Sequence, residues 1–125
     1  MKLVAVVGCT LTVTPTAPAT GGSAAVQTAP STTVRAQGAA VYRGPIVVGV
    51  TGVVAAPDYT QVPATQPVTI TPTTGLGLAD TQAIVRQDDQ GTGVVNLASP
   101  SGNPPLAVPV TVAVSDAGQT KVRLR

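Results

Sequence analysis

Glycine and proline interrupt this chain so often that a helical fold is excluded. The 125 residues include 13 glycines and 12 prolines. No stretch of a dozen residues free of both carries apolar side chains at the 3.6-residue period of a helix. The segment that comes closest, 79–90, ends in Asp88-Asp89-Gln90-Gly91, which is typical of a turn. The sequence therefore predicts an all-β fold, in one domain spanning residues 1–125.

Alternation of β-branched residues with small or polar residues predicts short antiparallel strands. The alternation is plainest in 10–14, 68–71 and 108–115, where Val, Leu or Ile occupies every second position. In the last of these runs, four valines share one face: Val108, Val110, Val112 and Val114. Because proline cannot donate a ladder hydrogen bond, Pro109 predicts that this strand lies at a sheet border or begins there.

Other segments predict bends and loops. Residues 41–54 are nearly continuous in β-forming residues but are broken by Gly44-Pro45, Gly49 and Gly52. This pattern predicts a buried or sharply bent pair of strands. Residues 14–28 and 99–105 are rich in Thr, Ala, Pro, Ser and Gly and predict extended loops.

The first nine residues, Met1-Lys-Leu-Val-Ala-Val-Val-Gly-Cys9, look like a bacterial lipoprotein signal. The apolar run from Leu3 to Val7 is shorter than the roughly 7–15 residues of a signal core, so we expect a first strand instead. No run approaches the roughly 18 apolar residues of a membrane helix. Cys9 has no second cysteine to pair with, and we expect it to act as a small buried hydrophobic residue.

The chain lacks most of the side chains that enzymes use. It has no histidine and no glutamate, one cysteine and two tyrosines, so no general base is available to activate a hydroxyl. The Gly75–Gly77 and Gly91–Gly93 pieces lack the strand–loop–helix context of nucleotide binding. Asp88 and Asp89 are conceivable ligands for a hard cation, but adjacent aspartates before a glycine are typical of a turn. We expect no catalysis, no cofactor, no metal and no small-molecule substrate.

The charge and the core point toward assembly with a partner. Seven Lys and Arg against five Asp give a net charge of +2, with no basic run and no interleaved aromatics, so nucleic-acid binding is not expected. With 2% aromatic residues and no Phe or Trp, the core must be aliphatic, and binding to a partner would stabilise it. Lys121, Arg123 and Arg125 share one face of a predicted strand. That face is either solvated or a basic rim facing an acidic partner.

One segment recurs three times, at 31–44, 74–88 and 119–125. Thr32-Thr-Val-Arg35 matches Thr120-Lys-Val-Arg123, and Ala36–Arg43 matches Ala79–Arg86. Each copy follows a valine-rich strand, so the repeat cores lie near 26–44, 68–91 and 112–125. The copies are roughly 43 residues apart, within the range of about 20–50 residues that is typical of stacked or radially arranged units.

These segments resemble the repeated element of PAAR and PAAR-like proteins. Those proteins are small cones that tip the central spike of contractile phage tails and related injection machines. The resemblance rests on 33–43, 83–93 and 118–123. It implies a conical domain with pseudo-three-fold repeats that caps a trimeric spike, one copy per trimer. It also implies a non-enzymatic role at the tail baseplate tip of a virion, or on an extracellular injection particle, with transient contact with the target cell envelope.

Three further expectations follow from the resemblance. Typical members bind a metal near the apex through histidines, usually with a cysteine, and a chain with no His and one Cys cannot form that ligand set. We expect the apex to be held by packing and hydrogen bonds instead, supplied by 100–109. Several basic residues recur at equivalent places or lie in the last strand and are the candidate spike contacts: Arg35, Arg43, Arg86, Lys121, Arg123 and Arg125. Solvated side chains remain the alternative for these residues.

Other functions suit a small β-rich chain as well. A capsid decoration protein or another baseplate component would share its composition, and so would a secreted adhesin-like domain. Copy number distinguishes the first two, because a spike tip occurs once per particle and a decoration protein tens to hundreds of times.

Overall fold

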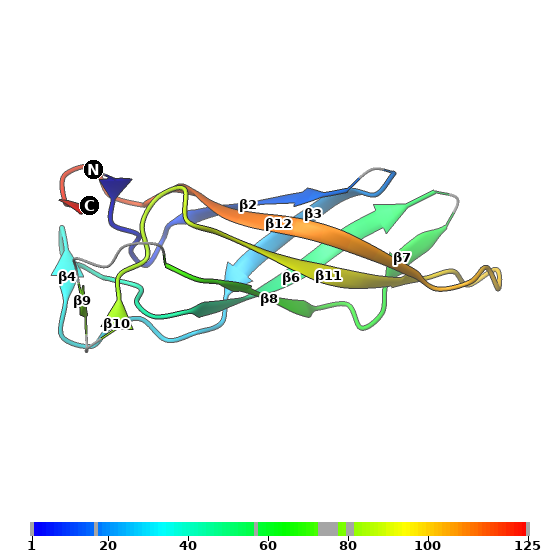
Figure 1. Cartoon of the computed structure of the whole chain (residues 1–125), viewed down its shortest axis with the longest axis horizontal. Coiled ribbons are helices and arrows are strands. Elements are labelled where there is room, and N and C mark those ends of the chain that lie inside the picture. Colours follow the sequence, from blue (N-terminus) through cyan, green and yellow to red (C-terminus); the bar gives the residue numbers. More distant parts are fainter. Residues whose placement is uncertain (1, 17, 57, 73–77, 80–81, 125) are drawn as a thin grey trace.

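The computed structural model describes residues 2–16, 18–56, 58–72, 78–79 and 82–124, and these form strands, turns and loops without a helix. The predicted all-β class is confirmed (Figure 1). No helical segment suited to crossing a bilayer occurs among those residues. The strands are β1 (Lys2–Leu3), β2 (Thr10–Pro15), β3 (Thr20–Val26), β4 (Arg35–Ala36), β5 (Ala39–Ala40), β6 (Ile46–Ala55), β7 (Tyr59–Gln61), β8 (Gln66–Ile70), β9 (Leu78–Ala79), β10 (Gln82–Ala83), β11 (Gln90–Ala98), β12 (Leu106–Asp116) and β13 (Arg123–Leu124).

Seven strands build one antiparallel sheet that folds back on itself. The hydrogen-bonded order is β2-β12-β11-β7-β6-β3, and β8 also pairs with β6. β2, β12 and β11 form one layer, β3, β6 and β8 form the other, and β7 joins the two by pairing with both β11 and β6 (Figure 1). The layers lie close together: a methyl group on Gly22 of β3 would sit 3.0 Å from Val13 of β2.

The core between the layers is aliphatic, as the composition requires. The inward face of β12 carries the four predicted valines, each at most 4% exposed, which confirms the alternation. Ile46, Ile70 and Leu97 are the largest side chains among those that are fully buried. Burying such a side chain stabilises the fold by about 1.5–3 kcal/mol. A second, smaller cluster lies apart from this core and contains Val4, Val6, Ala36, Val41 and Ile84.

Two loop and bend predictions were wrong. Segment 41–54 was predicted as a buried or sharply bent pair of strands, but residues 46–55 form the single strand β6, most of whose residues are buried. It is held by β3 on one side and by β8 and then β7 on the other. Gly52, at φ +78°, lies opposite Gly22, at φ +104°, and the register with β3 is the same on both sides of this pair. The two glycines therefore accommodate a local change of backbone conformation without ending the strand. Segment 14–28 is also no loop, because β2 runs to Pro15 and β3 occupies 20–26. Segment 99–105 is a loop, as predicted.

The position of β12 also differs from the prediction. This strand lies inside its sheet, between β11 and β2, although it contains Pro109. The Pro109 carbonyl oxygen accepts a hydrogen bond from the Thr16 N–H at 3.0 Å. A residue's N and C=O point to the same side of a strand, so the Pro109 nitrogen also faces β2. The ladder with β2 ends one position earlier, at the pair Val110 and Pro15. Proline is tolerated there because no ladder bond is lost.

The chain leaves the sandwich repeatedly at one end, next to both termini (Figure 1). Here β4 pairs with β5, β9 with β10, and β1 with β13. Single bridges join Val6 to Val41, Arg43 to Ile84, and Val4 to Arg86. The expected first strand is present as β1, but it spans only two residues and is followed by isolated bridges at Val4 and Val6. We call this part, with β1, β4, β5, β9, β10 and β13, the terminal end.

The described parts of all three repeat segments lie at the terminal end (Figure 1). The first two form hairpins of two-residue strands, and the turn of the first uses Gln37 and Gly38 at φ +49° and +81°. The third contributes β13, which pairs with the N-terminal strand β1 instead of folding on itself. The predicted pseudo-three-fold relation among the segments is not confirmed.

Candidate partner interface

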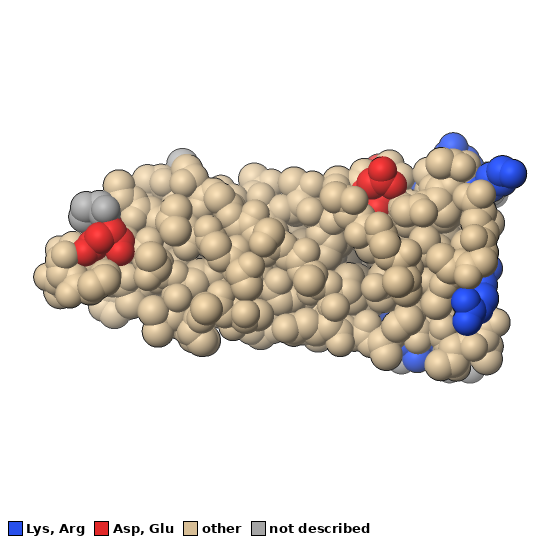
Figure 2. Space-filling model, turned by 180° about the vertical axis from the view of Figure 1, so that it is seen from behind, with Lys and Arg blue, Asp and Glu red and all other residues tan. Residues whose placement is uncertain are grey.

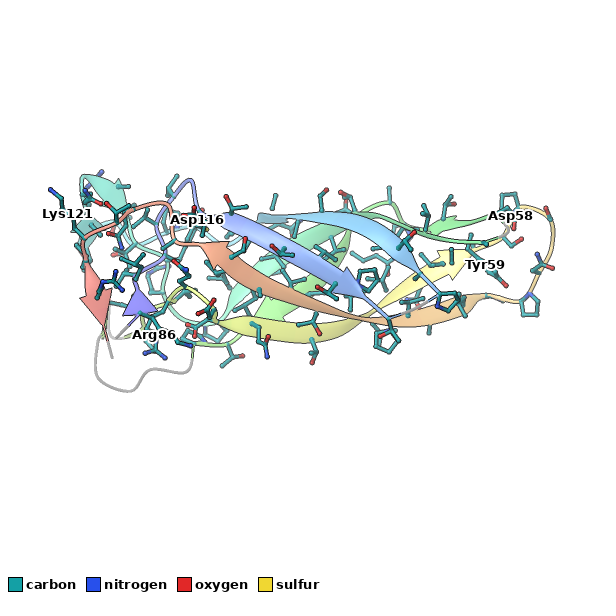
Figure 3. All side chains as sticks on the ribbon, turned by 90° about the horizontal axis from the view of Figure 1, so that it is seen from above. Asp58, Tyr59, Arg86, Asp116 and Lys121 are labelled. Atoms are coloured by element: carbon teal, nitrogen blue, oxygen red, sulfur yellow. The ribbon has the colours of Figure 1, made fainter. Side chains whose placement is uncertain are left out.

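Charged side chains are concentrated at the terminal end. Figure 2 shows Lys and Arg gathered there, and the rest of the visible surface is almost uncharged. The strands of the two layers carry one charged residue, Asp116, at the last position of β12. Asp58 lies at the opposite end, beside the 99–105 loop (Figure 3), and we call Asp58, Tyr59 and 99–105 the loop end. The molecule therefore has a charged terminal end and a loop end with a single acidic group. We call the part between them the shaft; it consists of the two layers, β2, β12 and β11 against β3, β6 and β8, and is uncharged except for Asp116 at its border with the terminal end (Figure 3).

The predicted contact residues that the structure describes all lie at the terminal end, but they are not equivalent. Arg35 is exposed, and its guanidinium donates to the Gly38 carbonyl at 3.1 Å. Arg43 is half-buried and donates to the Ala29 carbonyl at 2.8 Å. Lys121 and Arg123 are exposed. Arg125 lies outside the described residues.

Arg86 is a largely buried member of the predicted contacts. Its side chain is 11% exposed and lies 4.0 Å from the carboxylate of Asp89, which is 1% exposed. The same carboxylate accepts the Arg86 backbone N–H at 2.8 Å. This pair secures the turn before β11, and Asp88 in that turn has φ +71°. The predicted Asp88-Asp89 turn is confirmed, and Arg86 contributes to its structure more than to the surface.

The pairing of β1 with β13 brings Lys2, which was not among the predicted contacts, next to the last strand. Lys2 lies opposite Leu124 and Leu3 opposite Arg123. A hollow of about 120 Å³ opens beside this ladder, lined by Lys2, Leu3, Gln87, Asp88 and Arg123. The Gln87 N–H donates to the Leu3 carbonyl at 2.7 Å, which ties the turn to β1. The hollow thus combines two cations with an amide and one carboxylate.

A buried glutamine fixes the backbone that carries Lys121. Gln119 is 6% exposed, and its amide nitrogen donates to the carbonyls of Val4 at 2.9 Å and Val122 at 2.8 Å. Its side-chain oxygen accepts the N–H groups of Lys121 and Val122, each at 2.8 Å. A second amide, that of Gln37, accepts the Thr120 N–H at 2.7 Å. The basic segment is therefore held on a hydrogen-bonded frame that links both termini.

The loop end is held together by Asp58. Its carboxylate accepts a hydrogen bond from the Ser99 hydroxyl at 2.6 Å, from the Ser101 N–H at 3.2 Å and from the Ser101 hydroxyl. These bonds, first those of Ser101 and then that of Ser99, hold the pKa of Asp58 below its usual value. Tyr59 donates its hydroxyl to the Pro104 carbonyl at 2.7 Å. Residues 99–104 are thus held by hydrogen bonds to Asp58 and Tyr59, and no local sequence pattern marked Asp58 as the acceptor.

Cys9 packs against the main core as a small hydrophobic residue, as predicted, but it is half-buried instead of buried. Burial raises the pKa of its thiol. Within the described ranges, no three His, Cys, Asp or Glu side chains gather where they could hold a metal ion.

Comparison with known proteins adds no relative. The chain matches no protein-family model, no curated protein and no solved structure. The resemblance to PAAR-like proteins therefore rests on the short repeated segments alone.

Proposed function

We propose that this chain is a non-enzymatic structural protein that caps a trimeric spike in a contractile tail baseplate or a related injection particle. Its terminal end would sit on the spike and its loop end would point outward. The observation that carries this proposal is the convergence of three similar segments on one end of a charge-poor body (Figures 1 and 2). The first and the third of these segments present exposed cations there, at Arg35, Lys121 and Arg123.

The terminal end suits the binding of one copy of this chain to a spike made of three chains. A single chain can match a three-fold platform only by offering three similar surfaces, and 31–44, 74–88 and 119–125 all reach this end. They contribute β4 with β5, β9 with β10, and β13. Short strands at a sheet edge bind a partner's strands through main-chain hydrogen bonds, which is the mode called β-augmentation. Covering such edges also removes an aggregation hazard.

The shaft and the loop end suit passage through a cell envelope. Moving a charged group out of water is costly, and an unpaired charge is the most expensive group to bury. The strands of the two layers contain a single charged residue, Asp116. It is the last residue of β12, on the side of the terminal end (Figure 3). The carboxylate at the loop end, Asp58, is already hydrogen-bonded to two serines. A body of this kind meets a membrane with little charge to desolvate.

Stoichiometry tests the proposal. The full chain would be mixed with a candidate trimeric spike from the same particle, and the complex weighed by native mass spectrometry. We expect one copy of this chain for every three spike chains. A particle that carries tens to hundreds of copies would instead identify a decoration protein. Reproducible hydrolytic turnover by the purified chain would contradict the non-enzymatic assignment.

A further inference from the structure

We propose that the hollow beside β1 and β13 binds a carboxylate of the partner protein, so that the terminal end docks on an acidic protein surface. This inference rests on the proposed function only in taking the terminal end as the mounting end. It adds the chemistry of the partner and the position of one anchoring contact.

The donors around the hollow suit a carboxylate. Lys2 and Arg123 line it from two paired strands, and both side chains are exposed. A guanidinium presents two parallel N–H groups that match the two oxygens of a carboxylate, and a lysine ammonium adds a third donor. The backbone on both sides is fixed, because Gln87 is bonded to Leu3 and Gln119 holds the segment before Arg123. The backbone that carries both cations is therefore fixed before a partner arrives.

The charge around the hollow favours an acidic partner. The described terminal end carries six cations, Lys2, Arg35, Arg43, Arg86, Lys121 and Arg123, against three aspartates, Asp88, Asp89 and Asp116. Its net charge is +3, and Asp89 is already engaged with Arg86. A patch of one sign accelerates encounter with a surface of the opposite sign and suppresses wrong partners.

A protein surface fits better than a nucleic acid. Single strands are bound by stacking bases on exposed aromatics, but Tyr42 is 8% exposed and Tyr59 lies at the loop end (Figure 3). Asp88 lines the hollow next to the cations and would repel a phosphate chain. A protein can place a hydrogen-bond donor against Asp88 and a carboxylate against Arg123, which satisfies both signs.

The test is a titration of the ¹⁵N-labelled full chain with a decaglutamate peptide at low ionic strength, followed by NMR. We expect amide shifts at Lys2, Gln87, Asp88 and Arg123. We expect Arg123→Gln to weaken binding by about two- to five-fold, which is the usual strength of one exposed ion pair. The matched control is Arg35→Gln, which removes the same charge from the same end but outside the hollow, and should change the dissociation constant by less. Raising the salt should weaken binding.

Several results would overturn the inference. These are the absence of any shift at low salt, shifts centred outside the hollow, equal weakening by both arginine variants, or tighter binding of a decathymidylate strand. Unchanged thermal melting of each variant separates lost binding from lost folding. One copy per three spike chains without peptide binding at the hollow would leave the mounting intact and refute the carboxylate site. Peptide binding at the hollow without a spike complex would support the carboxylate site and contradict the mounting on a spike.

Discussion

Replacing Gln66 with methionine tests how the two layers are joined along β8. β8 has a ladder with β6 but none with β11, which lies against it. The Gln66 side chain, 5% exposed, crosses this seam. Its amide nitrogen donates to the Asn96 carbonyl at 2.8 Å and its oxygen accepts the Asn96 N–H at 2.8 Å. The side chain thus replaces a pair of main-chain bonds.

The size of the effect follows from these contacts. Methionine has a similar length but no strong hydrogen-bonding group, so the change removes both bonds to Asn96 and a third to the Pro63 carbonyl, at 3.1 Å. Each buried polar group left without a partner costs about 1–3 kcal/mol. Asn96 is exposed, so water can replace part of these bonds in the variant, and we expect a loss of about 2–4 kcal/mol. That is a large share of the roughly 5–15 kcal/mol that stabilises a typical domain.

Urea unfolding followed by far-ultraviolet circular dichroism measures this loss, since the chain has no tryptophan to report by fluorescence. The matched control is Gln90→Met on the exposed start of β11, which should change the unfolding free energy by less than about 0.5 kcal/mol. The denaturant slope should stay constant in both variants. A Gln66→Met protein as stable as the control would refute the reasoning.

Three further outcomes are expected. A methyl group on Gly91 would collide with a main-chain carbonyl of β8, whereas a methyl group on Gly93 would meet only a valine methyl group, at 3.0 Å. Gly91→Ala should therefore lower the urea midpoint more than Gly93→Ala, and equal midpoints would contradict this. NMR titration should place the Asp58 pKa below that of an unstructured aspartate, and Ser101→Ala should raise it. Because the folded pKa is lowered, these bonds stabilise the fold above the unfolded-state pKa, and their contribution is lost as the pH falls through the folded value. Alkylation of Cys9 near pH 8 should be slow and should accelerate in denaturant, since burial raises the pKa of the thiol; equal rates would argue against burial.

The strands could be predicted where side chains alternate, and not where pairing alone makes the strand. The four alternating valines of β12 predict a buried face, and all four are buried in the structure. β3 contains Gly21 and Gly22, whose low strand propensity predicts a loop. The strand exists because β6 pairs with it and because glycine lets it approach β2. Tertiary context of this kind outweighs local propensity in sheets.

The candidate site was predictable residue by residue but not as an assembly. Arg35 and Arg123 were identified from the repeat, and Lys121 from the basic face of the last predicted strand. Lys2 joins them only because β1 pairs with β13 across almost the whole chain length. Likewise, Asp58 meets Ser99 and Ser101 across 41 and 43 residues. No local pattern marks contacts of such long range, because they depend on where the sheet brings the loops.

Asymmetric cryo-electron microscopy of an intact particle tests the central claim most directly. We predict one copy of this chain at the extremity of the central spike, with the terminal end against the spike trimer and the Asp58 loops facing outward. Density for many copies on the particle shell, or a single copy seated with those loops against the spike, would contradict the account.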